Sequence, residues 1–377
     1  MIEVQDIFLS YGEEYRRTHS LSLQQEKTFD AISSCRTAAL GGHLEACPEC
    51  GQARISYNSC KNRHCPKCQA FAKEKWIEER SCDLLDIGYY HAVFTVPSEL
   101  YPLFYSNQEE LYGLLFRCAW ETVKAFATDK RYLGAKTGAT CVLHTWGRRL
   151  QYHPHVHMII PSGGLTTSGT WRNSSKNFFA PVRAMSKVFR GKLLASLKKM
   201  HHGLRFYGSS ADLARPDAFS CLISSLYVKD WVVYCKKPFR DAGCVLAYLG
   251  RYTHRIALSN SRIIADDDGR IVFKYRDSRD GDREKVTRLD ALEFIRRFLM
   301  HVLPKGFAKI RHYGILASRD KNERIDRCKR LTNTPVTIRV AVDALRIVER
   351  MIGRRPGVCA VCNCALIRLP LTGALLC

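Results

Sequence analysis

The chain has 377 residues and a mass of 43.0 kDa, enough for two or three domains and a substantial hydrophobic core. Lysine and arginine outnumber aspartate and glutamate by 59 to 36, and the net charge of +23 points to a polyanionic partner, most often nucleic acid, although a generally basic surface would give the same total. No stretch has the length of a membrane span or the layout of a secretory signal, so the 17 cysteines favour metal-bound or free thiols in a reducing compartment over a disulfide framework.

The first 85 residues form a cysteine-rich module between two segments with helical patterns, about 2–37 and 70–85. Two C-x2-C pairs in this module are separated by fourteen residues, a spacing close to that of a structural zinc site. The pairs are Cys47-Pro-Glu-Cys50 and Cys65-Pro-Lys-Cys68. Four thiolates can surround one Zn²⁺ tetrahedrally, so the pattern predicts a single zinc site that lets a small module fold without a large core.

Other residues of the module are candidates to complete or replace that ligand set. Cys60 and His64 lie between the two pairs and are alternative or additional ligands, against the simpler interpretation of a buried thiol and a surface imidazole. Cys35 and His43 are weaker candidates. The module also carries many basic residues, which suit contact with a DNA backbone, so we expect it to bind DNA.

The middle of the chain predicts strands and helices in mixed order. Residues 89–96 are β-branched and aromatic and predict a strand, and residues 98–130 have a helical pattern. Residues 139–146 and 150–160, joined by a short Gly-Arg-Arg turn, predict a β-hairpin.

The second strand of that hairpin carries three histidines in five residues. Side chains alternate between the two faces of a strand, so His153, His155 and His157 all point the same way. Three imidazoles on one face form a ready site for a divalent metal, whereas a lone histidine is more often a satisfied polar residue. The metal would act as a Lewis acid on a phosphoryl oxygen and orient the scissile phosphate.

The third ligand of that site is a separate question. Strand geometry favours His153, although Pro154 is awkward in a central strand and easier near an edge. His144 on the preceding strand and His254 further along the chain are weaker candidates.

Residues 165–228 are less regular, resemble an insertion and include a basic helical stretch at 187–204. The later elements are predicted as a strand at 230–235, a helix at 241–253, a hairpin at 256–275 turning at Asp267-Asp268-Gly269, a helix at 291–302, a strand at 308–316 and a basic helical tail. Strands and helices in this order fit an α+β fold rather than an alternating parallel one.

Two tyrosines stand out in the predicted helix at 241–253. Tyr248 and Tyr252 are four residues apart, so a helix places both hydroxyls on one face. An aromatic stripe facing the core would give the same spacing, but an activated tyrosine oxygen is also a competent nucleophile toward a phosphodiester. Arg251 and Arg255 lie close by and can hold phosphates bidentately, unless they are ordinary surface charges.

Two further features concern the C-terminal third. Arg296 and Arg297 are interleaved with aromatic residues, a mixture suited to contact with single-stranded DNA, although a solvated helix face would look the same. A second cysteine cluster has one C-x2-C pair and no clear partner, so it is either a zinc site, half of one, or a set of uncommitted thiols. It comprises Cys359, Cys362, Cys364 and Cys377.

Several motifs together resemble one family, the rolling-circle insertion-sequence transposases of the IS-ninety-one type, within the wider class of HUH endonucleases. The His-hydrophobic-His sequence His155-Val-His157 is the signature for which that class is named. The other motifs are Tyr57-Asn-Ser-Cys-Lys-Asn-Arg-His-Cys-Pro-Lys-Cys68, His144-Thr-Trp-Gly147, Tyr248-Leu-Gly-Arg-Tyr-Thr-His-Arg-Ile256, Phe294-Ile-Arg-Arg-Phe-Leu-Met-His-Val-Leu-Pro-Lys-Gly306 and Ile310-Arg-His-Tyr-Gly314. The resemblance covers almost the whole chain.

The resemblance implies an HUH-type antiparallel β-sheet core flanked by helices, with an N-terminal zinc-ribbon-like helical module. It implies cleavage and rejoining of single-stranded DNA at element termini and target through a 5′-phosphotyrosine, with Mg²⁺ or Mn²⁺ as catalytic cofactor, structural Zn²⁺, and a bacterial cytoplasmic, nucleoid-associated location. The family's metal pair falls on His155 and His157, and its two nucleophiles fall on Tyr248 and Tyr252.

We therefore predict a zinc-binding DNA-binding domain at 1–85, a catalytic domain at 86–320 with an insertion at 165–228, and a basic tail with a cysteine cluster at 321–377. Two alternatives remain beside a transposase. A rolling-circle replication initiator or relaxase would share the chemistry, and a non-catalytic zinc-ribbon regulator would explain the charge and cysteines but not the combination of histidine strand and tyrosine pair.

Overall fold

The computed structural model describes residues 2–175, 179–239, 245, 250, 253, 257–277 and 280–371. The fold is α+β with antiparallel sheets, as the order of predicted elements indicates. Within the described residues, no helix is both long and apolar enough to cross a membrane.

A five-stranded antiparallel sheet forms the centre of the molecule, with the strand order β12-β4-β5-β3-β8. Its strands are β3 (Tyr89–Thr95), β4 (Gly138–Trp146), β5 (Tyr152–Pro161), β8 (Val233–Phe239) and β12 (Ile310–Gly314). The hairpin predicted from the histidine motif is β4 and β5, and β5 is the central strand of the sheet.

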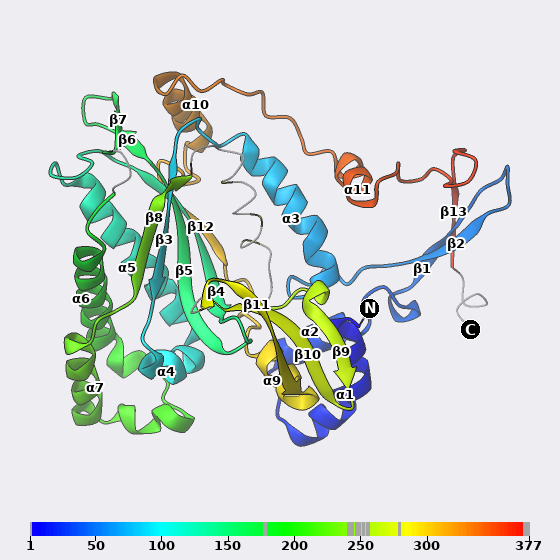
Figure 1. Ribbon diagram of the computed structural model, residues 1–377, viewed down its shortest axis with the longest axis horizontal. Coiled ribbons are helices and arrows are strands. Elements are labelled where there is room, and N and C mark those ends of the chain that lie inside the picture. Colours follow the sequence, from blue (N-terminus) through cyan, green and yellow to red (C-terminus); the bar gives the residue numbers. More distant parts are fainter. Residues whose placement is uncertain are drawn as a thin grey trace.

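Alternation along β5 separates an apolar face of the sheet from a histidine face. Tyr152, Val156, Met158 and Ile160 are buried in the main hydrophobic core, and the histidines occupy the intervening positions. The apolar face is covered by α5 (Gln108–Thr128) and α6 (Val182–Met200), which Figure 1 shows on one side of the sheet, with α3 (Pro66–Ser81) on the other.

Smaller elements complete this part of the molecule. They are α4 (Tyr101–Ser106), α7 (Pro216–Val228), β6 (Gly163–Leu165) and β7 (Trp171–Asn173). Residues 165–228 include α6, whose Phe189, Leu193, Leu194 and Leu197 are buried in the main core. This segment therefore contributes directly to the packing of the central sheet.

Pro154 lies in the central strand of the sheet, whereas a proline is more easily accommodated near a sheet edge. The ladder between β3 and β5 ends at the pair Thr95 and His155, and the register between β4 and β5 shifts just beyond His144. Because regular pairing stops on both sides at this point, the missing amide hydrogen of proline costs no regular ladder bond.

A second core joins the N-terminal helices to a hairpin much later in the chain. The helices α1 (Val4–Thr18) and α2 (Leu23–Ser33) share buried residues with α9 (Ala291–Leu299) and the sheet of β9 (Ile263–Asp267), β10 (Arg270–Asp277) and β11 (Arg283–Asp290). Asp268 and Gly269, both with positive φ, form the two-residue turn between β9 and β10, as the sequence predicts.

The predicted N-terminal helix is two helices, because Ser22 starts a new one. Its side chain accepts a hydrogen bond from the Gln25 amide, and the Gln25 side chain accepts one from the Ser22 amide, a capping box.

The remaining N-terminal and C-terminal segments meet beside α3. A small sheet contains β1 (Gly42–Ala46), β2 (Ala53–Tyr57) and β13 (Ile367–Pro370) in the order β13-β1-β2. The chain reaches it from α10 (Lys321–Leu331) through α11 (Ala344–Ile352), and Figure 1 shows this segment passing along α3 to the projecting β1–β2 hairpin.

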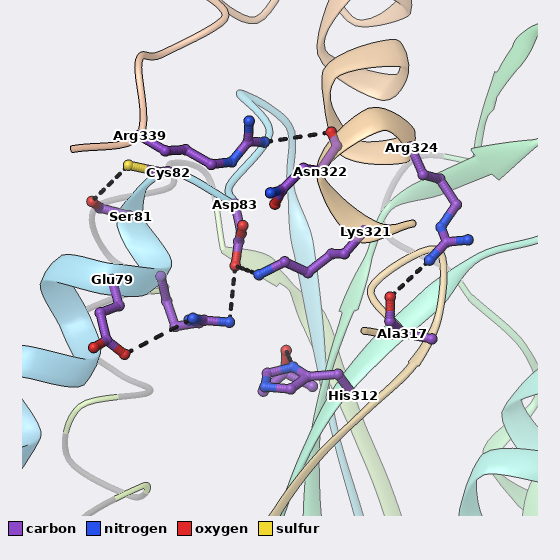
Figure 2. Close-up of polar contacts among 12 residues, drawn as sticks. Glu79, Ser81, Cys82, Asp83, His312, Ala317, Lys321, Asn322, Arg324 and Arg339 are labelled. Atoms are coloured by element: carbon purple, nitrogen blue, oxygen red, sulfur yellow. Dashed lines mark hydrogen bonds and ion pairs between the residues drawn. The ribbon is translucent and has the colours of Figure 1, made fainter. Parts of the chain in front are cut away.

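Ion pairs hold the start of α10 against the end of α3. The Asp83 carboxylate accepts a hydrogen bond from the Lys321 ammonium at 2.7 Å and pairs with Arg80 at 3.2 Å (Figure 2). Arg339 donates to the backbone carbonyl of Asn322 and pairs with Asp326, which draws the following extended segment onto α10.

Candidate functional site

Three histidines converge on the face of the central sheet that lies opposite α5 and α6. His144 on β4 stands directly across from His155 on β5, and His157 follows two residues later on the same face. Their ligand nitrogens all lie within 4.8 Å of one another, and the Nε2 atoms of His155 and His157 are 3.1 Å apart. We call this set the imidazole centre.

Hydrogen bonds orient two of these rings from behind. The Nδ1 of His155 donates to the backbone carbonyl of His153 at 2.6 Å, which leaves the Nε2 lone pair free. The Nδ1 of His157 lies 2.9 Å from the Nε2 of His91, a buried residue of β3. Such outer partners fix the tautomer and direction of a metal-binding imidazole.

Sequence reasoning missed His91. Its signal is a histidine within the otherwise apolar strand Tyr89–Thr95, where a buried imidazole requires a hydrogen-bond partner.

Burial keeps the centre in the protonation state that a cation requires. Desolvation lowers the pKa of His155 to about 3 and that of His91 to about 4, and it holds the pKa of His157 well below its usual value, with His144 adding to the effect. At neutral pH His91, His155 and His157 are therefore uncharged. Three imidazoles whose ligand nitrogens converge in this way fit a divalent transition metal.

His153, the first choice for third ligand, is not brought together with the converging nitrogens of this centre. Its ring centroid lies 4.9 Å from that of His155, but its Nδ1 forms a hydrogen bond with the hydroxyl of Tyr101 on α4. The position on β4 directly opposite His155 brings a different imidazole beside the β5 pair. His144, the weaker candidate, occupies that opposite position.

A half-buried lysine lies beside the imidazole centre. Trp146 stacks on His144 with ring centroids 4.5 Å apart, and the Lys309 ammonium lies 4.7 Å from the centroid of the Trp146 ring. Burial and, to a smaller extent, the charge of Arg63 together lower the pKa of Lys309 to about 7. The charge of Lys309 also acts on His157, so it is within electrostatic reach of the centre.

The predicted nucleophiles and their neighbours lie outside the described residues. These are Tyr248, Arg251, Tyr252, His254 and Arg255.

Single described residues of the same segment show where it passes. Val245 is fully buried with Tyr89 and with Ile159, which follows His157 on the same face of β5. Gly250 lies so close to α3 that an added Cβ would come within 2.3 Å of the Ile77 side chain. Val245 thus lies on the histidine face of the sheet, and Gly250 lies against α3.

The cysteines form two four-thiol groups rather than the single site predicted from the two N-terminal pairs. The inner cluster contains Cys35, Cys60, Cys65 and Cys68, and the outer cluster contains Cys47, Cys50, Cys359 and Cys362. Each predicted pair is therefore half of a different cluster. The spacing rule failed because α3 begins at Cys65 and faces the end of α2, whereas the first pair lies at the tip of the β1–β2 hairpin.

Sulfur separations in the inner cluster match tetrahedral zinc. The Cys35–Cys68, Cys60–Cys68 and Cys35–Cys65 sulfurs are 3.7, 3.6 and 3.6 Å apart. Four sulfurs at zinc–sulfur distances of about 2.3 Å are separated from one another by about 3.8 Å. Cys60, named as an additional ligand, and Cys35, a weaker candidate, both belong to this cluster.

The other candidate zinc ligands have different neighbours. His64 is buried and accepts a hydrogen bond at Nε2 from the amide of Leu303 at 3.1 Å, which links the N-terminal module to the segment after α9, and it is not among the thiols of the inner cluster. His43 lies 3.4 Å from the Glu45 carboxylate. Cys364 is half-buried and stands outside both clusters, and Cys377 lies outside the described residues.

Arg296 and Arg297 face a carboxylate on their own helix. Their Nε atoms each lie 2.6 Å from an oxygen of Glu293. Hydrogen bonds from Arg296 and then Arg297 lower the pKa of Glu293 to about 2, although partial burial opposes the shift. Much of their charge is thus compensated within α9.

Two family models match the chain. One, described as "Transposase zinc-binding domain", matches residues 7–96, and the other, described as "Putative transposase", matches residues 138–324. No solved structure matches.

Two curated proteins are similar over most of their length. The chain is 44% identical over 369 residues, 96% of this chain and 93% of the relative, to "Putative transposase y4qJ" of Sinorhizobium fredii (strain NBRC 101917 / NGR234). It is 32% identical over 299 residues, 78% of this chain and 70% of the relative, to "Transposase for insertion sequence element IS801" of Pseudomonas savastanoi pv. phaseolicola.

These matches define the class of the protein, which is a transposase. More narrowly, the chain belongs to the IS91-type insertion-sequence transposases that carry an N-terminal zinc-binding domain. The zinc-binding family match and the cysteine clusters together support structural zinc in this chain.

Proposed function

We propose that this transposase is an HUH endonuclease that nicks and rejoins single-stranded DNA at the ends of its element and at the target. Tyr248 and Tyr252 are the nucleophiles, and His144, His155 and His157 hold a catalytic divalent cation. The protein acts in the bacterial cytoplasm on the nucleoid, and Arg251 and Arg255 contact phosphates beside the tyrosines.

One observation carries the proposal. The Nε2 atoms of His155 and His157 lie 3.1 Å apart, with His144 across the ladder, and hydrogen bonds from behind hold the rings of the β5 pair. Three imidazoles whose ligand nitrogens lie within 4.8 Å of one another form a donor set suited to a divalent transition metal. Val245, three residues before Tyr248, packs on the same face.

The proposed reaction transfers a phosphoryl group from the 3′ oxygen of one nucleotide to the tyrosine oxygen. The tyrosine Oη attacks the phosphorus and its proton leaves to solvent or a base, while the bond from phosphorus to the 3′ oxygen breaks and that oxygen takes up a proton. The products are a 5′-phosphotyrosine and a free 3′-hydroxyl. In the reverse reaction a 3′-hydroxyl attacks the phosphotyrosine, restores the phosphodiester and releases the tyrosine. Two tyrosines allow two such cleavages in sequence.

The protein's own groups would prepare that reaction. When bound, a divalent ion supplies Lewis-acid stabilisation of charge on a phosphoryl oxygen. His91 and the His153 carbonyl keep the imidazoles of His157 and His155 in the binding tautomer. Lys309, beside Trp146, offers a positive charge to a phosphate at the centre. Imidazole donors favour Mn²⁺ over Mg²⁺, which prefers oxygen ligands.

The test is formation of a covalent adduct. Purified protein is incubated with 5′- or 3′-labelled single-stranded DNA carrying candidate element ends, with Mn²⁺, Mg²⁺ or EDTA, and the products are separated on a denaturing gel. We expect a metal-dependent adduct with the fragment downstream of the nick, which carries the 3′ label, greater with Mn²⁺, and no adduct from the Tyr248→Phe, Tyr252→Phe double variant. The single variants assign the order of the two tyrosines.

Retained DNA binding without adduct, for every metal and every end, would contradict the proposal and favour a protein that binds DNA without cutting it. A replication initiator or relaxase would give the same adduct. The two relatives and the zinc-binding domain favour the transposase, and joining of an excised end to a second DNA molecule distinguishes the outcomes.

A further inference from the structure

We infer that the outer cluster is a second zinc site, built jointly by the two ends of the chain, which fastens the C-terminal segment to the N-terminal hairpin. Its ligands are Cys47, Cys50, Cys359 and Cys362. The matched zinc-binding region, residues 7–96, contains only the first two of these. The site would be incomplete in either end alone.

The two cysteine pairs have the same local backbone geometry. The Cys47 amide donates to the carbonyl of Gln52 at 2.8 Å, and the Gly51 amide donates to the carbonyl of Cys47 at 3.1 Å. In the second pair, the Cys359 amide donates to the carbonyl of Cys364 at 2.8 Å, and the Asn363 amide donates to the carbonyl of Cys359 at 3.1 Å.

The residue after each pair is also equivalent. Gly51 and Asn363 have φ values of 71° and 61°, in the left-handed region that glycine and asparagine tolerate best. The amide of Val361 lies 3.4 Å from the Cys359 sulfur, and amide hydrogen bonds stabilise a thiolate. Two tight turns of this kind, each presenting two sulfurs, form the usual frame of a four-thiolate zinc site.

Contacts between sulfurs cross from one turn to the other. The Cys47 and Cys362 sulfurs are 3.3 Å apart, and the Cys50 and Cys359 sulfurs are 3.5 Å apart. These separations are too long for a disulfide bond, whose sulfurs lie about 2.05 Å apart. They are close to the separation of about 3.8 Å expected around tetrahedral zinc.

Strand pairing brings the two turns into register. β13 pairs with β1 from His43 opposite Pro370 to Ala46 opposite Ile367. Glu45 on β1 is buried, and its carboxylate pairs with Arg368 on β13 and with Arg54 on β2. The small sheet is thus assembled from both ends of the chain.

Among the residues that the structure describes, none of this small sheet belongs to a hydrophobic core cluster. All four residues of β13 are exposed, and Ile55 and Leu369 are 47% and 46% exposed. The buried residues of the small sheet and its two cysteine turns are Cys47, Cys359 and Glu45. A module of this kind needs a metal to fold, because burial of apolar surface contributes little.

Beyond the sheet, the C-terminal segment has few attachments to the body. Arg350 on α11 pairs with Glu78 on α3 at 2.8 Å, Arg339 pairs with Asp326, and Ile347 is buried. Exposed ion pairs of this kind contribute little on their own. The metal therefore fixes the C-terminal segment along α3, the helix whose Ile77 lies against Gly250.

Cobalt substitution of the full-length protein tests this inference. The intensity of the charge-transfer band from thiolate to Co²⁺ is proportional to the number of thiolate ligands, and the imidazole centre does not contribute to it. We expect the Cys359→Ser, Cys362→Ser variant and the Cys50→Ser variant to lose about half of this absorption, and the double variant to bind one metal fewer per chain by elemental analysis. Cys221→Ser, at an exposed cysteine outside both clusters, should change neither quantity.

Full absorption and unchanged metal content in the cysteine variants would overturn the inference. Circular dichroism checks that the variants remain folded. If a variant loses all thiolate absorption, stepwise chelation of the wild-type protein decides. The inference requires two phases of zinc release, the first accompanied by protease cleavage between α10 and β13, and a single phase would contradict it. Neither readout depends on DNA cleavage, so the proposed function is tested separately.

Discussion

The imidazole centre and the thiol clusters are both suited to metals, but they are built in opposite ways. The imidazole centre draws its ligands from 14 consecutive residues on two paired strands of the central sheet, and protein hydrogen bonds already orient its rings. The outer thiol cluster joins sulfurs 315 residues apart in the sequence, on turns with little else to hold them.

The difference teaches which part of the protein depends on its metal for structure. A site on a packed sheet exists before the ion arrives, so the ion adds chemistry to a finished scaffold. A site on loops is formed by the ion, because the free energy of binding is also free energy of folding. Metal removal should therefore abolish DNA cleavage at the imidazole centre without unfolding the sheet, whereas at the outer thiol cluster it should unfold the segments that carry the cysteines.

The inner thiol cluster should give the largest effect when it is broken. Cys65 is buried at the first turn of α3, within the core shared by α1, α2 and α9. Structural zinc contributes roughly 10 kcal/mol or more of folding free energy in small modules. We expect Cys65→Ser to lower the melting temperature by at least about 10 °C and to remove amide-exchange protection from residues 2–85.

Cys221→Ser is the matched control, since it removes an exposed thiol on α7 and should leave both measurements unchanged. A Cys65→Ser protein with wild-type melting and exchange would show that the inner cluster is not needed for folding.

The imidazole centre should give the opposite pattern. We expect His157→Ala to reduce adduct formation by about 10³-fold, because a Lewis acid contributes several kcal/mol to stabilisation of the transition state. Its melting temperature should change by no more than about 3 °C, since the strand and its apolar face remain. The rate comes from the labelled-DNA assay and the melting temperature from scanning calorimetry.

His144→Ala and His153→Ala form a matched pair in the same assay. His144 lies in the centre and His153 bonds to Tyr101, so the first should behave like His157→Ala and the second like wild type. The reverse result would restore His153 as the third ligand and reject the cross-strand geometry.

The sequence predicted local elements well because local physical chemistry determines them. Alternation along β5 correctly gave one polar and one apolar face, and Asp268-Gly269 correctly marked a hairpin turn. The division of the N-terminal helix at Ser22 was missed, although the capping box with Gln25 is visible in the sequence.

The features of the sites that the sequence did not predict depend on contacts between residues distant in sequence. Local spacing identified both cysteine pairs, but only tertiary structure could show that the first pair meets Cys359 and Cys362. In the same way, same-face alternation found His155 and His157, whereas the position of His144 opposite His155 depends on the register between two strands.

Substitution of His91 should reduce cleavage less than substitution of His157, because His91 orients a metal ligand and is not a ligand itself. Its Nε2 lies 2.9 Å from the Nδ1 of His157. Loss of an outer-shell partner usually reduces metal affinity 10- to 100-fold. We expect His91→Ala to raise the Mn²⁺ concentration for half-maximal cleavage by about that factor, with the maximal rate largely recovered at saturating Mn²⁺.

His312→Ala is the control for that experiment, since His312 lies on the same sheet but bonds to Thr140. A His91→Ala protein whose lost rate saturating Mn²⁺ fails to restore would show that His91 acts in the reaction itself and not through His157.

An ion pair on the exposed side of α9, which includes no metal ligand, should give the smallest effect and serve as a reference for the other variants. Glu293 on α9 has a pKa of about 2 when folded, because Arg296 and Arg297 donate hydrogen bonds to it. A pKa below its unfolded value means that the pair stabilises the fold above about pH 4.5 and that this contribution is lost as pH falls toward 2. With allowance for solvent screening, we expect Glu293→Gln to cost about 1 to 2 kcal/mol at pH 7. The difference in free energy of unfolding between the variant and wild type, measured by urea denaturation, should shrink steadily between pH 5 and 3.

A difference in free energy of unfolding that grows on acidification would contradict this prediction, because Glu293 would then stabilise the fold as the neutral acid and not as the partner of two arginines.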